Sequence, residues 1–135
     1  MACLDTTLLV DLARAQKKSR EAARQKIREL VERGEPLLTT RLNVAELWVG
    51  VERASDRAAE LQKVQRVLAP IGILELDADA AASFGRIVGH LQSRGVAIGD
   101  MDALIAAIAV IHGQLLVTRN PEHFARVPGL RIEEY

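Results

Sequence analysis

Four acidic side chains and one amide stand beside apolar segments of the sequence, where packing alone gives them no role. Asp100 and Asp102 open the apolar stretch IGDMDALIAAIAV, and Asp5 closes the short apolar segment ACL. Glu46 and Asn120 follow two further apolar segments, PLLTT and LLVT. A carboxylate at the end of an apolar strand is costly to bury without a partner. A binding role is therefore the first hypothesis for Asp5.

Clustered carboxylates would point to a particular chemistry. They repel one another unless a cation or protons neutralise them. Mg²⁺ and Mn²⁺ suit such a pocket, because they prefer oxygen ligands and use few protein carboxylates together with waters and substrate phosphates. A metal held in this way activates water and shields the charge of a phosphodiester. If the acids converge, the sequence predicts a metal-dependent nuclease.

The elements that must position these acids follow from the hydrophobic pattern. Short apolar runs alternate with longer helical patterns, which is typical of an α/β fold with a mainly parallel sheet. Strands are predicted over residues 2–4, 36–40, 71–76, 114–118 and 130–135. Helices are predicted over residues 6–15, 19–34, 43–54, 56–69, 78–95, 100–112 and 121–127, with Asp77 capping the fifth. Residues 1–135 contain no repeat or linker and are expected to form a single domain.

The predicted topology brings distant residues together. The carboxyl ends of parallel strands meet at one edge of a sheet, where ligands of such folds bind. Asp5, Glu46, Asp102 and Asn120 each fall at a junction from strand to helix or in the first turn of a helix. We therefore expect them to converge in one acidic pocket.

Two of the acids also have a structural explanation. Glu46 lies three residues after Asn43, so NVAE can be read as a capping box with Asn43 as the N-cap. Asp100 is expected to be the N-cap of its helix, supporting a metal only through water. Residues two apart on a helix do not face each other, so Asp100 and Asp102 are expected to have different roles. Asp102 is the better candidate for a metal ligand, because capping does not require it. Asp11, on the first helix, is expected to be solvated.

The residues also match a family pattern, and the chain resembles the PIN domain, specifically the toxins of VapBC toxin–antitoxin modules. The first acid of the family resembles Asp5 in LDTTLLVDL, the second Glu46 in NVAELWVGV, and the third Asp102 in DALIAAIAVIHG. The fourth position follows a Thr-Arg pair, and VTRNPEHFARVPGL places Asn120 there. The four segments occur in order over nearly the whole chain.

The resemblance implies a three-layer α/β/α sandwich around a mainly parallel sheet. It implies an endoribonuclease with one or two Mg²⁺ or Mn²⁺ ions, for which Asp5, Glu46 and Asp102 are the catalytic residues and metal ligands. Asp100, next to Asp102 in the sequence, is added to the expected metal site on its position alone. It also implies a homodimer and a VapB-type antitoxin that blocks the active site. Asn120 in place of an acid removes one negative charge from the pocket. The alternative is a scaffold that binds RNA or a protein partner without cleavage.

Other polar residues near the acids are expected to support them. The hydroxyls of Thr6, Thr7 and Thr118 orient ligands or water, or else satisfy backbone groups at strand ends. Arg119 either holds an RNA phosphate or neutralises the acids. The two nearby histidines, His112 and His123, are not expected to be catalytic.

A basic segment and one tryptophan are candidates for partner contacts. Residues 14–33 concentrate Lys and Arg, either as a solvated helix with intrahelical pairs or as a patch that guides RNA phosphates. The apolar face of this helix, including Ala22, Ala23 and Val31, is expected to be mostly core, with part of it available to an antitoxin helix. Trp48 is expected to pack in the core or to anchor an interface.

Composition excludes several classes of protein. The formal net charge is zero, so RNA contacts depend on local basic patches. No run of 18 apolar residues predicts a membrane span, and Asp5 interrupts what would be a signal peptide. The single cysteine, Cys3, excludes an intrachain disulfide, and we expect a cytoplasmic protein. A phospho-accepting signalling domain is set aside, because Thr6 rather than a second acid follows Asp5.

Overall fold

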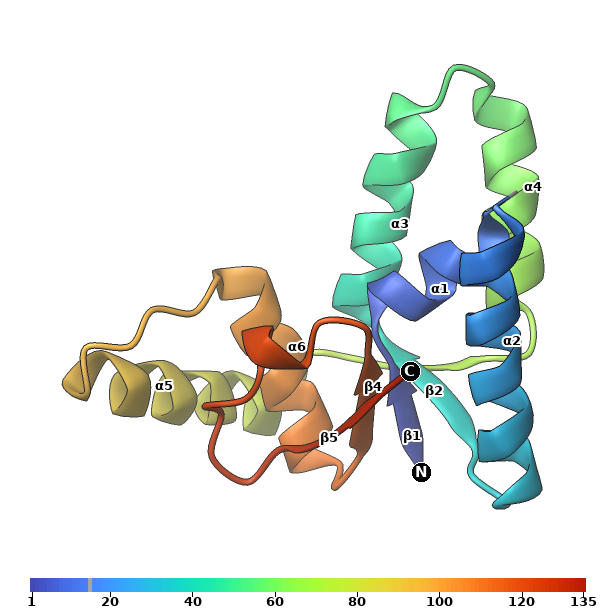
Figure 1. Cartoon of the computed structure of the whole chain (residues 1–135). Coiled ribbons are helices and arrows are strands. Elements are labelled where there is room, and N and C mark those ends of the chain that lie inside the picture. The colour runs from blue at the N-terminus through green and yellow to red at the C-terminus, as the bar shows by residue number, and fades with distance from the viewer. Residues whose placement is uncertain (15) are drawn as a thin grey trace.

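The protein is built on a parallel β-sheet, seen in the computed structural model of residues 1–14 and 16–135 (Figure 1). The order of its strands across the sheet is β3-β2-β1-β4-β5, and all four pairings are parallel. The strands are β1 (Ala2–Leu4), β2 (Leu37–Thr40), β3 (Gly72–Leu74), β4 (Leu115–Thr118) and β5 (Arg131–Glu134). The mainly parallel sheet predicted from the sequence is confirmed.

In the described residues, six α-helices and one 3₁₀ turn accompany this sheet. They are α1 (Thr6–Ala13), α2 (Lys17–Glu32), α3 (Arg41–Arg53), α4 (Arg57–Leu68), α5 (Ala78–Ser93), α6 (Asp100–Ile111) and the 3₁₀ turn η1 (Pro121–His123). Helices α1 and α2 lie on one face and α5 and α6 on the other, while α3 and α4 form a hairpin that extends beyond the sheet (Figure 1). The three-layer sandwich is therefore confirmed.

The two layers of core follow from the alternation of side chains along the strands. On one face, Leu4 of β1 and Val117 of β4 pack with apolar residues of α1, α2 and α4. On the other face, Cys3 and Leu116 pack with apolar residues of α5 and α6. Central strands covered on both faces explain why ACL and LLVT read as continuous apolar runs.

Several element boundaries differ from the prediction. The first helix ends at Ala13, and its expected end at Ala15 lies outside the described residues. The predicted strand 71–76 shortens to three residues, because β3 is an edge strand that pairs only with β2. The predicted helix 121–127 is a single 3₁₀ turn that ends at His123, and turns and bends follow it up to Pro128 and Gly129. Asp77 caps α5 as predicted, accepting from the Ala80 N–H at 2.9 Å.

The strand order creates one preferred place for a site. The chain moves outward from β1 through β2 to β3, and then returns to the other side of β1 with β4. The crevice at such a reversal, outside the carboxyl ends of the strands, is where open α/β sheets bind ligands. Asp5 follows β1 and Thr118 ends β4, so both stand at this point. In the described part of the chain no helix is long and apolar enough to cross a bilayer.

Candidate active site

Asp5 is the buried centre of the site, with 6 % of its surface exposed. It occupies the N-cap position of α1, but its side chain does not cap that helix. Instead, its Oδ2 accepts hydrogen bonds from the Thr118 hydroxyl at 2.7 Å and the Thr7 hydroxyl at 3.3 Å, and its Oδ1 accepts one from Asn43 Nδ2 at 3.2 Å. Three donors therefore fix one carboxylate from three different segments.

Asn43 is a site residue whose role the sequence prediction missed. It is fully buried, and its Nδ2 donates to Thr6 Oγ1 at 2.9 Å as well as to Asp5. Its Oδ1 accepts from the backbone N–H and the hydroxyl of Thr40. These two residues form the capping box of α3, with Thr40 as the N-cap. The spacing T-x-x-N in TTRLN was the available signal.

This capping box corrects the structural explanation offered for Glu46. Helix α3 begins at Arg41, directly after β2, so Asn43 is its third residue and not its N-cap. Glu46 therefore lies in the second turn and takes no part in the cap. Its Oε1 accepts a hydrogen bond from the Thr6 hydroxyl at 2.7 Å. Burial raises the pKa of Glu46, the Thr6 hydrogen bond opposes this, and the charges of Asp5 and Asp102 raise the pKa further.

Asp102 joins the site from α6. It is the third residue of that helix, and its side chain is 32 % exposed. Burial raises the pKa of Asp102, the nearby His123 lowers it, and the charge of Asp5 raises it. The prediction that Asp100 caps α6 is wrong, because the backbone is already helical at Asp100 and Gly99 is the N-cap. Asp100 is exposed, and its role as a ligand stays a prediction.

One cavity of about 380 Å³ collects the predicted residues. Its wall includes Asp5, Glu46 and Asp102 from three separate segments, together with Asn120 and the histidine His123. Thr6, Thr7, Arg119, Val10 and Arg14 complete the wall. Asp100 does not belong to it. The convergence expected from the topology is thus present for three acids and Asn120.

Two hydroxyls link the cavity wall to the loop after β4. Thr118 Oγ1 accepts from the Asn120 N–H at 3.1 Å while donating to Asp5. Thr7 Oγ1 accepts from the Arg119 N–H, also at 3.1 Å. Thr7 and Thr118 therefore satisfy loop backbone groups, which was one of the two roles weighed from the sequence, and each also donates to Asp5. Their role in orienting ligands or water stays a prediction.

Arg119 is engaged by a residue that the sequence prediction placed in solvent. Asp11 is 1 % exposed, and its Oδ2 accepts from Arg119 Nη1 at 2.7 Å and from the Tyr135 hydroxyl at 2.9 Å. Its Oδ1 lies 3.7 Å from Arg14 Nη1 and has no hydrogen-bond partner within residues 1–14 and 16–135. The Asp11 prediction was wrong because β5 and the β4 loop cover this face of α1. The guanidinium thus neutralises Asp11.

A family model for the PIN domain matches residues 2–130. The chain belongs to the PIN domain family. Curated relatives include the "tRNA(fMet)-specific endonuclease VapC" of Salmonella typhimurium, 32 % identical over 70 % of this chain and 71 % of the relative. "Ribonuclease VapC19" of Mycobacterium tuberculosis is 31 % identical over 97 % of this chain and 98 % of the relative.

Solved PIN structures share the whole fold. VapBC2 from Rickettsia felis, bound to a DNA fragment from its promoter, contains a chain that superposes with a TM-score of 0.90. The two chains are 25 % identical, and the match covers 99 % of this chain and 98 % of that chain. DNA-bound VapBC from Salmonella typhimurium gives a TM-score of 0.86 at 27 % identity, with the same two coverages.

The donor chemistry of this PIN site fits a hard divalent cation. Three carboxylates line the cavity, and two of them have pKa values raised by burial and mutual repulsion. Within residues 1–14 and 16–135, no three His, Cys, Asp or Glu side chains are arranged as a ready-made metal set. Mg²⁺ does not require one, because it keeps several waters and binds through one or two carboxylates. Asp5, Glu46 and Asp102 are the residues that would hold it.

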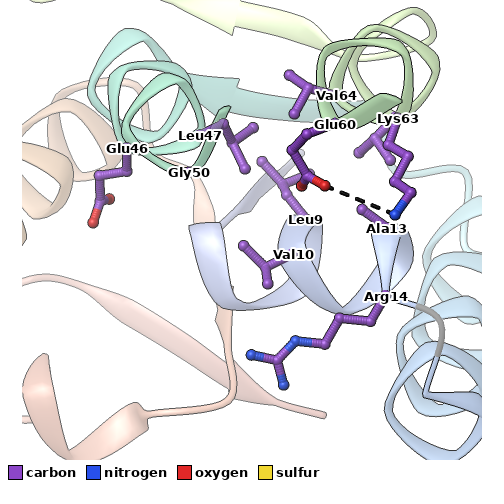
Figure 2. A pocket seen from close by; sticks show the side chains of 11 residues that line it. Leu9, Val10, Ala13, Arg14, Glu46, Leu47, Gly50, Glu60, Lys63 and Val64 are labelled. Carbon is purple, nitrogen blue, oxygen red and sulfur yellow. Dashed lines mark ion pairs between the residues drawn. The ribbon is translucent and has the colours of Figure 1, made fainter. Parts of the chain in front are cut away.

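An apolar groove, whose lining residues Figure 2 shows, shares residues with the acidic cavity of the PIN domain. This cavity of about 320 Å³ lies among α1, α3 and α4, with Leu9, Leu47 and Val64 in its wall. Glu46 stands at its edge, and Val10, Arg14 and Glu46 line both cavities. The groove and the acidic cavity are therefore adjacent and share Glu46.

Four of the eight Lys and Arg residues of the basic segment, Arg14, Lys26, Arg28 and Arg33, form ion pairs. Arg28 pairs with Glu21, while Lys26 and Arg33 both pair with Glu133 of β5. The apolar face of α2 is only partly core, since Ala23 and Leu30 are buried whereas Ala22 and Val31 are exposed. Trp48 is 45 % exposed, so core packing is wrong for this residue.

The raised pKa of Glu46 predicts a pH-dependent effect on stability. Because the folded state holds this proton more strongly than the unfolded state, stability falls as pH rises through the folded pKa. Glu46→Gln removes the charge and retains an acceptor for Thr6. We expect a higher Tm than wild type at pH 7, with the difference vanishing below about pH 4, where both states are protonated.

Thermal unfolding followed by circular dichroism between pH 3.5 and 8 measures this difference. Glu32→Gln, at an exposed position of α2, is the matched control and should leave the Tm unchanged. An equal gain in Tm for Glu46→Gln at pH 3.5 and at pH 8 would contradict a raised pKa for Glu46 in the folded state.

The buried Asp11 predicts a second effect on stability. Arg119→Ala leaves a 1 % exposed carboxylate without its charged donor, so we expect a loss of about 1–3 kcal/mol in the free energy of unfolding. Urea denaturation at pH 7 measures it. Arg86→Ala, at an exposed position of α5, is the control and should change the free energy of unfolding only slightly. Asp11→Asn should be less destabilising in the Arg119→Ala background than in wild type, and additive losses would show that the two side chains are uncoupled.

Proposed function

We propose that this PIN-domain protein is a divalent-metal-dependent endoribonuclease, the toxin of a VapBC toxin–antitoxin module. The observation that carries the proposal is the convergence of Asp5, Glu46 and Asp102 on one cavity at the reversal point of the sheet. Curated relatives named as VapC ribonucleases and endonucleases support it. RNA is the substrate and Mg²⁺ or Mn²⁺ the cofactor.

The chain's own residues prepare the site for a phosphodiester. Thr118, Thr7 and Asn43 hold Asp5 in a fixed position, and Thr6 does the same for Glu46. A bound divalent ion supplies Lewis-acid stabilisation of phosphate charge and activation of water. Arg14 and Arg119 line the same cavity, and the exposed part of each guanidinium can contact a neighbouring phosphate. The fixed acids therefore need little rearrangement on binding.

We further propose a VapB-type antitoxin as the partner, acting in the cytoplasm. The structural relatives include VapBC complexes. The apolar groove among α1, α3 and α4 offers a surface for an antitoxin segment next to Glu46. We expect a homodimer as well, for which the exposed apolar side chains Trp48 and Val49 of α3 are candidate contacts.

A scaffold without activity is the second candidate, and Asn120 favours it. This neutral amide lines the cavity at the position where the family resemblance expects an acid. Such a scaffold would bind RNA without producing fragments.

RNA cleavage by the purified protein with Mg²⁺, Mn²⁺ or EDTA tests the proposal. We expect fragments only with a metal, and a loss of more than about 100-fold in Asp5→Asn and Asp102→Asn, since losing even an outer partner of a metal ligand costs 10–100-fold. Asp79→Asn, an exposed acid in the first turn of α5, should retain wild-type activity. Denaturing gels of total RNA give the readout.

Two results would contradict the proposal. Fragments that persist in Asp5→Asn at the wild-type rate would place the activity elsewhere. Binding of RNA without cleavage under either metal would favour the scaffold.

A further inference from the structure

A strongly basic cavity of about 380 Å³ lies among α1, α2 and α4. Helix α1 packs against both other helices (Figure 1). The charged part of the wall consists of Arg14, Arg20, Arg24, Lys63 and Arg66. The rest of the described wall is apolar and contains no Asp or Glu, being formed by Leu12, Ala13 and Val67. Five cations from three segments therefore share one cavity, in a chain whose formal net charge is zero.

The protein itself supplies little negative charge to this basic cavity. In residues 1–14 and 16–135, no carboxylate oxygen lies within 4.0 Å of three of its guanidiniums, those of Arg20, Arg24 and Arg66. Lys63 lies 3.8 Å from Glu60, and Arg14 lies 3.7 Å from Asp11. Like charges gathered in this way repel one another unless an opposite charge compensates them. The basic cavity therefore favours an anionic occupant.

The start of α2 adds to the positive potential beside the cavity. The N-cap residue, Gln16, makes no side-chain cap hydrogen bond, and the first turn contains no acid. The helix instead opens with Lys17, Lys18 and Arg20. A helix start carries partial positive charge on its unpaired N–H groups, so that acids are favourable there and cations are not. An anion bound at this end of α2 would compensate both the side chains and the helix dipole.

The position of the basic cavity points to RNA as the source of the anion. Arg14 lines both this cavity and the acidic one, so the two are adjacent. An RNA strand with one phosphate beside Asp5 and Asp102 would present its neighbouring phosphates to the basic wall. Proteins that hold single-stranded nucleic acid use positively charged grooves that follow the backbone. The described wall has no aromatic side chain for base stacking, so it is suited to phosphates and not to bases.

We propose that the basic cavity among α1, α2 and α4 binds backbone phosphates of the RNA away from the bond that is cut, and that it does so without regard to sequence. The inference rests on the proposed function, because RNA is the polyanion that the acidic cavity would cleave. It assigns to RNA only three cations of the basic segment, Arg14, Arg20 and Arg24. Lys63 and Arg66 of α4, which were not predicted from the sequence, complete the site.

Anisotropy of a fluorescein-labelled single-stranded RNA of mixed sequence tests this site, with EDTA present to prevent metal-dependent cleavage. The double variant Arg24→Gln, Arg66→Gln removes two cations that line the basic cavity and not the acidic one. We expect its Kd for the RNA to rise about tenfold or more at about 0.1 M salt. The plot of log Kd against log salt concentration should become shallower by about 1.4, because each phosphate contact on a single strand contributes about 0.7 to the slope.

The matched control is the double variant Arg28→Gln, Arg57→Gln. It also removes two cations, but these form surface ion pairs with Glu21 and Glu52 and lie outside the basic cavity. It should retain the wild-type Kd and salt dependence. An equal loss of affinity in the two double variants would overturn the inference, since the effect would then be one of net charge. Wild-type RNA binding by Arg24→Gln, Arg66→Gln would also overturn it and would favour an acidic protein segment as the occupant.

Cleavage of total RNA with Mg²⁺ or Mn²⁺ separates this inference from the proposed function. A selective loss of RNA binding in Arg24→Gln, Arg66→Gln would support the phosphate site even if the wild type produced no fragments, and the nuclease proposal alone would then fail. Unchanged binding in this variant together with metal-dependent fragments from the wild type would overturn the phosphate site and leave the nuclease.

Discussion

The hydrogen bond from Thr118 to Asp5 is the interaction on which the site depends. It joins the ends of two neighbouring parallel strands at 2.7 Å and leaves a carboxylate with 6 % exposure fully held. Burying a charge without partners is prohibitive, so the donors from β4, α1 and α3 are a requirement of folding as well as of function. The same contacts that make the fold tolerate Asp5 give it a fixed position for binding.

Glu46 and Asp102 differ from Asp5, because their ionised side chains lower the stability of the fold. Burial and the neighbouring negative charges raise the pKa of both side chains. Each therefore weakens the fold when ionised, in contrast to the capping acids Asp56 and Asp77, which stabilise helix ends. A protein keeps such unfavourable charges where a ligand compensates them, and perturbed carboxylates in a cleft are typical of functional sites.

The sequence was most informative about acidic residues that stand at the ends of apolar segments. Asp5 and Asp102 stand out because apolar segments surround them, and the mainly parallel sheet follows from the alternation of strands and helices. It was least informative about contacts between distant residues. Asn43 and Asp11 acquire their contacts from partners 38 and 108 positions away, as Asn43–Asp5 and Asp11–Arg119. The cap of α3 was misplaced by three residues because Asn43 is a good N-cap type as well.

The distance along the chain between Asp5 and Thr118 has a consequence for biosynthesis. The two residues are 113 positions apart, so β1 cannot gain its β4 neighbour until most of the chain has left the ribosome. Contacts of such long sequence separation form late, because the chain must close a large loop first. The carboxylate at the centre of the site is thus assembled only near the end of translation. A nascent or prematurely terminated chain that lacks β4 would carry Asp5 without the hydroxyl that holds it, and therefore without the assembled pocket.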